Sequence, residues 1–154
     1  MSFSKNISLY NQFNGRYDFT FVGNTLNPIE NSFQSFPAVL TTSDATLALN
    51  SGDVIESAYL YWAGCGTGDF NVKLNGVDIT ATRTFSNVLD QGAPFIFNFF
   101  SAFTDVTSQV QATGNGIYTL SDLDVSPFID HHALNSTNFA GWAILIVYQN
   151  DNLP

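Results

Sequence analysis

The sequence predicts an all-β fold, an antiparallel β-sandwich of jelly-roll or Greek-key type, from three observations. Apolar and polar residues alternate with a period of two in several short segments, and turn residues such as Asn-Gly separate these segments. Helical periodicity is almost absent and no β-α-β alternation occurs, while long irregular connections favour Greek-key crossovers over simple hairpins. The length of 154 residues suits one domain, residues 1–154.

The first strand is expected at residues 16–26, where Tyr17, Phe19 and Phe21 share one face. Asn27-Pro28 ends it, and residues 28–45 contain two prolines and many small polar residues, which predicts a long connection. A short strand at residues 46–50 is expected before the turn at residues 51–53.

The next strand lies within ESAYLYWAGC, where Ala58, Leu60 and Trp62 alternate with Ser57, Tyr59 and Tyr61. Ala58, Leu60 and Trp62 are expected to face the core, which places Tyr59 and Tyr61 on the opposite face. Three glycines then mark a loop, and FNVKLNGVDIT predicts a hairpin. Its turn is Asn75-Gly76, because both residues tolerate positive φ.

The second half of the chain holds three more expected strands, at residues 94–103, 117–120 and 141–148. The first is expected to be central in its sheet. A short helix should follow it, capped by Thr104 or Asp105, with Val106 and Val110 facing inward. Residues 121–140 predict a loop of unusual length. The segment GWAILIVY is apolar on both faces, so it predicts a strand that leaves an open sheet edge for a partner strand.

The composition excludes several classes of partner. The formal net charge of −9 would repel a phosphate backbone, so nucleic acid is excluded as a partner. No apolar run approaches the roughly 20 residues of a membrane-spanning helix, so no membrane insertion is expected. One cysteine excludes an internal disulfide, and only two histidines accompany it, which excludes the usual four-ligand zinc sites.

Three segments together resemble a known family: AYLYWAGCGTGDFNVKLNGVDITA, SAFTDVTSQVQATGNGIYTLSDL and NFAGWAILIVYQNDNLP. They resemble the N-terminal β-domain of large cell-surface proteins of Bacteroidota that the type IX secretion system exports, gliding-motility-associated adhesins among them. The resemblance covers roughly residues 17–154. It implies a non-enzymatic extracellular module and a chain that continues beyond Pro154 in the parent protein. A looser similarity links the segments to galactose-binding-like jelly rolls.

The candidate ligand-binding residues lie on the aromatic strand and in the loop after it. Tyr59 and Tyr61 could stack on sugar rings and offer their hydroxyls, with Trp62 beside them. Asp69 and Asn71 follow three glycines, which let the backbone approach a cation or a glycan closely. For all five residues the alternative is an ordinary structural role in strand and turn.

Other candidate sites are weaker. Asp122 and Asp124 lie two residues apart, so an extended backbone would aim both carboxylates at one Ca²⁺ ion, although acids at strand ends also occur without metal. No cofactor other than calcium is expected. Asp130-His131-His132 is the one place where a base and an acid adjoin, but neighbouring residues of a strand point in opposite directions. No enzymatic activity is therefore expected.

These observations predict an adhesin-like or structural module on the cell surface. Its partners would be a surface glycan or the neighbouring domains of the same chain. The alternative is a carbohydrate-binding module attached to a polysaccharide hydrolase.

Overall fold

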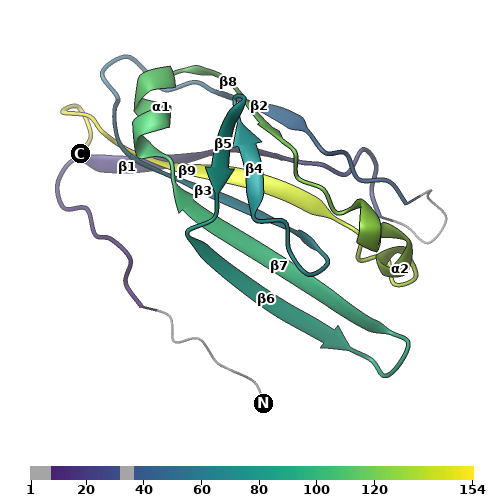
Figure 1. The fold of residues 1–154 in the computed structure, drawn as a ribbon. Coiled ribbons are helices and arrows are strands. Elements are labelled where there is room, and N and C mark those ends of the chain that lie inside the picture. The colour runs from purple at the N-terminus through teal and green to yellow at the C-terminus, as the bar shows by residue number, and fades with distance from the viewer. Residues whose placement is uncertain (1–7, 32–36) are drawn as a thin grey trace.

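The computed structural model describes residues 8–31 and 37–154, which fold into two antiparallel β-sheets packed face to face (Figure 1). The five-stranded sheet has the order β1-β9-β3-β7-β6 and the four-stranded sheet the order β2-β8-β4-β5. The predicted all-β antiparallel sandwich is therefore confirmed. The elements are β1 (Tyr17–Thr25), β2 (Ser43–Leu47), β3 (Val54–Cys65), β4 (Asn71–Leu74), β5 (Val77–Thr80), β6 (Arg83–Asp90), β7 (Ile96–Asp105), α1 (Thr107–Thr113), β8 (Gly116–Ser121), η1 (Ser126–Phe128), α2 (Ile129–Ala133) and β9 (Ala140–Gln149).

The core lies between the two sheets, and the alternation of side chains along each strand supplies it. Leu60 and Trp62 of β3 are buried there together with Ile144 of β9. The four-stranded sheet contributes residues such as Leu74 and Leu120. The inward placement of Ala58, Leu60 and Trp62 is thus confirmed.

Local features of the sequence produce the expected turn and helix. Asn75 and Gly76 have φ of 50° and 78°, and they join β4 to β5 in a two-residue turn. The helix α1 begins at Thr107 with Val106 at its N-cap, so the expected cap at Thr104 or Asp105 is wrong. The Asp105 carboxylate accepts a hydrogen bond from the Thr107 N–H at 2.9 Å, just ahead of the helix. Val110 is fully buried, as its expected inward position requires.

The C-terminal strand β9 lies in the interior of the five-stranded sheet. It pairs with β1 along its whole length on one side and with β3 on the other. The predicted open edge for a partner strand is therefore wrong. Ile144 and Ile146 of its inner face lie in the core, while Leu145 and Val147 of its outer face lie among aromatic side chains of β1 and β3. The strand β7 is also paired on both sides, with β3 and β6.

Three elements differ from the expectation. The strand β2 begins three residues earlier than predicted, because pairing with β8 sets its position. The strand β6 was not predicted, since its side chains are exposed and it gains its structure from pairing with β7. The predicted loop at residues 121–140 contains η1 and α2, with Ile129 and His132 buried. Figure 1 shows α1 and α2 at opposite ends of the sandwich.

No helix among residues 8–31 and 37–154 is both long and apolar enough to span a bilayer.

Candidate binding groove

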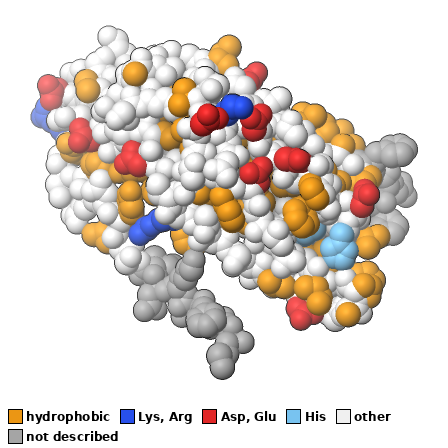
Figure 2. Space-filling model, viewed as in Figure 1, with side chains coloured by type: hydrophobic (Ala, Val, Ile, Leu, Met, Phe, Trp, Pro, Cys, Tyr) orange, Lys and Arg blue, Asp and Glu red, His pale blue; other side chains and the backbone are white. Residues whose placement is uncertain are grey.

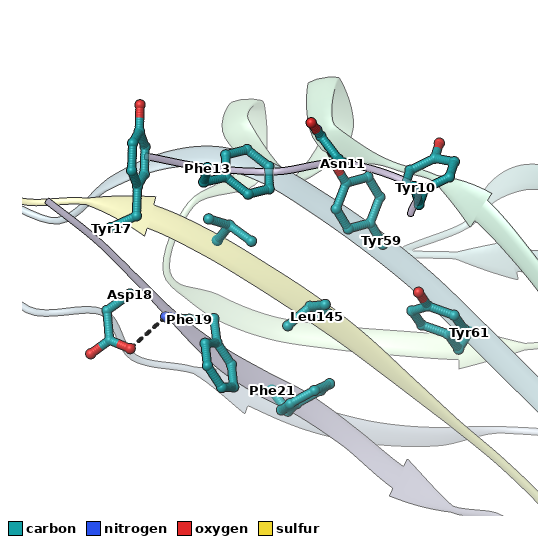
Figure 3. A pocket seen from close by; sticks show the side chains of 11 residues that line it. Tyr10, Asn11, Phe13, Tyr17, Asp18, Phe19, Phe21, Tyr59, Tyr61 and Leu145 are labelled. Atoms are coloured by element: carbon teal, nitrogen blue, oxygen red, sulfur yellow. Dashed lines mark hydrogen bonds between the residues drawn. The ribbon is translucent and has the colours of Figure 1, made fainter. Parts of the chain in front are cut away.

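A groove of about 540 Å³ lies on the outer face of the five-stranded sheet, the face that the second sheet does not cover. Its lining is largely aromatic. Figure 3 shows Tyr10, Phe13 and Tyr17 along one side of it and Phe19 and Phe21 along the other. The lining residues are Tyr10, Asn11, Phe13, Tyr17, Asp18, Phe19, Phe21, Tyr59, Tyr61, Leu145 and Val147.

Strand register brings residues from three separate segments together in this groove. Phe21 of β1 and Tyr59 of β3 lie on either side of Leu145 of β9, so the three form one row across the sheet. Phe19 and Val147 form the next row. The rings of Phe19 and Phe21 meet edge to face at 5.9 Å, and each side chain is 59% exposed. Exposed phenylalanines at this density mark a surface suited to contact with a ligand or partner.

The second wall of the groove is a segment without regular structure, residues 8–16, which we call the lead-in strap. Its Tyr10 ring lies edge-on to the rings of Tyr59 and Phe103, at centroid distances of 5.4 and 5.1 Å. The Asn11 amide donates a hydrogen bond to the Tyr59 hydroxyl at 3.1 Å. The Arg83 guanidinium lies 5.0 Å from the centre of the Tyr10 ring, within the range of a cation–π contact.

The energy that holds the strap is small. Each aromatic pair contributes about 0.5–1.5 kcal/mol beyond its buried area. The hydrogen bond adds about 0.5–1.5 kcal/mol. The strap is therefore held against the sheet by a few side-chain contacts.

The two tyrosines of β3 differ in accessibility although both face outward. Tyr61 is 43% exposed, whereas Tyr59 is 5% exposed because the strap covers it. Burial raises the pKa of the Tyr61 phenol, and the neighbouring phenols of Tyr10 and Tyr59 raise it further. The hydroxyl of Tyr61 therefore stays protonated at neutral pH and can donate a hydrogen bond. The outward placement of both rings follows the prediction.

Trp62 lies on the other face of β3 and has no access to the groove through its side chain. It is 1% exposed, and its indole N–H donates a hydrogen bond to the Asp69 carbonyl at 2.8 Å. The residue holds the loop after β3 against the core, so its role is structural.

Asp69 and Asn71 stand away from the groove and join neighbouring segments. The Asp69 carboxylate accepts a hydrogen bond from the Asp124 N–H at 2.8 Å. The side-chain oxygen of Asn71 accepts one from the Thr80 hydroxyl at 3.0 Å, across the β4–β5 hairpin. Neither residue lies among the lining side chains, so a ligand in the groove would not touch them.

The predicted calcium ligands have separate partners within the chain. The Asp122 carboxylate lies 2.6 Å from the Lys73 ammonium, and the Asp124 carboxylate accepts a hydrogen bond from the Ser126 N–H at 2.8 Å. Hydrogen bonds from Ser126 also lower the pKa of the Asp124 carboxyl. Within the described ranges, no group of three or more His, Cys, Asp and Glu side chains is arranged to hold a metal ion. Calcium at Asp122 and Asp124 stays a prediction.

The two histidines pack against aromatic rings. His131 stacks on Phe97 at 5.0 Å and lies 2.9 Å from the Ile96 carbonyl. His132 is buried, and its Nδ1 lies 3.0 Å from the Thr137 hydroxyl. Burial lowers the pKa of His132, and the neighbouring His131 lowers it further. Both rings therefore have partners that fix the end of β7 to α2.

Cys65 is fully buried, and burial raises the pKa of its thiol. A buried thiol with a raised pKa has little thiolate and is chemically inert. The residue packs within the core cluster.

The strap and the exposed rings of β1 are the parts of the groove that sequence reasoning did not assign. The sequence does place Tyr17, Phe19 and Phe21 on one face, as the structure confirms, but no pattern in it shows which face of β1 is left uncovered. Comparisons of the chain with protein-family models, curated proteins and solved structures find no match. The function of the groove therefore has to be inferred from its lining.

Proposed function

We propose that this chain is a non-enzymatic extracellular module of a bacterial surface protein and that its groove binds a glycan. The observation that carries the proposal is the group of aromatic rings that line the groove on the outer face of the five-stranded sheet, several of them tyrosines with hydroxyl groups. Aromatic rings can stack on the apolar faces of sugars while the tyrosine hydroxyls bind sugar hydroxyls.

Charge favours a neutral glycan over an acidic one. The lining contains one carboxylate, Asp18, and no lysine or arginine among the described residues. The whole chain carries a formal charge of −9, and Figure 2 shows acidic side chains dispersed over the visible face with few basic ones between them. A polyanion would approach this surface against an unfavourable potential.

The same lining supports binding without catalysis. Glycoside hydrolysis uses a pair of carboxyl groups placed on either side of the scissile bond. Asp18 stands without a second carboxylate among the described lining residues, and the groove contains no histidine or cysteine there. The residues present can hold a sugar chain and orient it.

The surface-protein part of the proposal is supported by the resemblance of residues 17–154 to the adhesin-type domains and by the low content of charge and cysteine. A carbohydrate-binding module of a polysaccharide hydrolase would use the same groove. The two roles differ in the domain to which the module is joined.

The test is native gel electrophoresis through gels containing β-glucan, xylan, galactomannan, starch or, as a polyanion, alginate. We expect at least one neutral polymer to retard the protein and alginate to have no effect. The Tyr61→Ala variant should lose the retardation, whereas Ile117→Ala, an exposed apolar residue on the other sheet, should keep it. Retardation by none of the neutral polymers, or equal retardation of Tyr61→Ala, would contradict the proposal.

A further inference from the structure

The strap covers an aromatic surface that belongs to the sheet. Tyr59 and Phe103 are 5% and 4% exposed, yet neither is part of the core cluster between the two sheets. Their rings stack at 5.8 Å on the outer face, and Tyr10 lies edge-on to both. The strap contributes to their burial, because Tyr10 packs against both rings and Asn11 donates a hydrogen bond to the Tyr59 hydroxyl. We name the surface formed by Tyr59, Phe103 and Arg83 the Tyr10 cradle.

The strap is attached to the cradle by side chains. Within the described part of the chain, the backbone of residues 8–14 makes no hydrogen bond to a strand of the sheet. Its side chains are exposed apart from Phe13, which is half-buried. Gly15, with a φ of 130°, stands where the strap joins β1, and glycine adopts such a φ without strain. Release of the strap would break few contacts and leave both sheets intact.

The cradle is continuous with the exposed part of the groove. The rings of Tyr61 and Phe103 are 5.1 Å apart, and the two residues are paired across β3 and β7. Arg83 is paired with Phe103 on the next strand, β6. With the strap displaced, the exposed ring of Tyr61 would become one end of a surface that includes Tyr59 and Phe103 and ends at the guanidinium of Arg83.

We infer that the Tyr10 cradle is a second sugar-binding subsite and that Tyr10 occupies it as an internal competitor. The inference rests on the proposed function of the groove. The ligand is a neutral sugar ring next to the one that stacks on Tyr61. It takes the place of the Tyr10 ring on Tyr59 and Phe103, and its hydroxyls accept hydrogen bonds from Arg83. Residues 8–16 therefore reduce the affinity of the module until a glycan chain displaces them.

The test compares three variants with the wild-type protein by isothermal titration with soluble β-glucan, xylan, galactomannan and starch. Tyr10→Ala removes the competitor, so its affinity should rise at least threefold for each polymer that the wild-type protein binds. Leu9→Ala is the matched control, because Leu9 lies on the same strap and is 78% exposed. It should bind as the wild-type protein does. The double variant Tyr10→Ala/Tyr59→Ala should lose the gain, since the sugar then lacks the ring of the subsite.

A second measurement follows the strap itself. The backbone ¹⁵N heteronuclear NOE of residues 8–14 should fall when a saturating amount of the bound polymer is added, because the strap leaves the sheet. An unchanged or weaker affinity of Tyr10→Ala, or a rise of the NOE on binding, would overturn the inference and leave the strap as a fixed wall of the groove. If no polymer binds either the wild-type protein or Tyr10→Ala, the proposed function fails together with the inference.

Discussion

The two faces of β3 carry large side chains at alternating positions, and they differ in what covers them. On the inner face, Leu60 and Trp62 lie beneath a second sheet. On the outer face, Tyr59 lies beneath a short strap, and Tyr61 is open to solvent. Alternation therefore divides a strand into two faces, while the covering layer decides how deeply each face is buried.

The difference between the two faces of β3 should have its largest effect on the free energy of unfolding. Trp62→Ala removes a fully buried indole together with its hydrogen bond to Asp69, and we expect a loss of about 3–5 kcal/mol in the free energy of unfolding. Urea denaturation followed by tyrosine and tryptophan fluorescence measures it. A loss below about 1 kcal/mol would mean that the inner face of β3 is not the core.

A second change breaks the support of the groove without touching its lining. Gly23 of β1 pairs with Ala143, and a Cβ at this position would overlap the Trp142 carbonyl oxygen. Gly23→Ala should therefore push β1 away from β9 and cost about 1–3 kcal/mol. Because β1 carries Phe19 and Phe21, polymer binding should weaken as well.

Thermal unfolding and affinity gels together measure the effect of Gly23→Ala. The control is Gly76→Ala, where an added Cβ meets nothing within 4 Å, so that the cost there comes only from the positive φ. If Gly23→Ala binds the polymer as tightly as the wild-type protein does, β1 does not contribute to binding in the groove.

A substitution on the outer face of β3 should weaken ligand binding and leave the free energy of unfolding nearly unchanged. Tyr61→Ala removes a ring that is 43% exposed, so the free energy of unfolding should change by less than about 1 kcal/mol. Affinity for the neutral polymer should fall about tenfold, which corresponds to about 1.4 kcal/mol. Titration calorimetry and urea denaturation of the same preparation compare the two quantities. A large loss of stability without loss of affinity would mean that Tyr61 stabilises the fold and does not contact the ligand.

The smallest effect is expected at the end of the sandwich, far along β7 from the groove. Burial lowers the pKa of His132 below its ordinary value of 6.5, so the folded protein binds fewer protons there than the unfolded chain does. This contribution to stability is fully present above pH 6.5 and is lost as the pH falls below it. Urea denaturation at pH 7.5 and 5.5 measures the dependence. In His132→Gln the dependence should shrink, and an unchanged slope would show that another group causes it.

Much of the fold could be predicted because its strands carry their own signals. The alternation in β3, the Asn75-Gly76 turn and the apolar run of β9 are local properties, and each predicts its element. The position of β9 in the sheet could not be predicted locally, because it depends on which strands pair on either side. The strand β6 could not be predicted for the same reason, because its pairing with β7 defines it and its own side-chain pattern does not.

The site was predictable to a smaller degree. Alternation places Tyr59 and Tyr61 on the face opposite Leu60, but it does not show that residues 8–16 cover only one of the two tyrosines. Alternation also does not show that Phe21 and Tyr59 lie in one row of the sheet. The two residues are far apart in the sequence, and it is the pairing of β1 and β3 with β9 that aligns them. Contacts between segments far apart in sequence are set by the register of the whole sheet.

The most direct test of the difference between the two faces is an amide ¹H–¹⁵N chemical-shift titration of the wild-type protein with the polymer that retards it. If the polymer binds the outer face of the five-stranded sheet, the shifts should be concentrated on β1, β3, β9 and residues 8–16. The amides of β2, β4, β5 and β8 should be unchanged. Shifts centred on the four-stranded sheet, or none at saturating polymer, would contradict it.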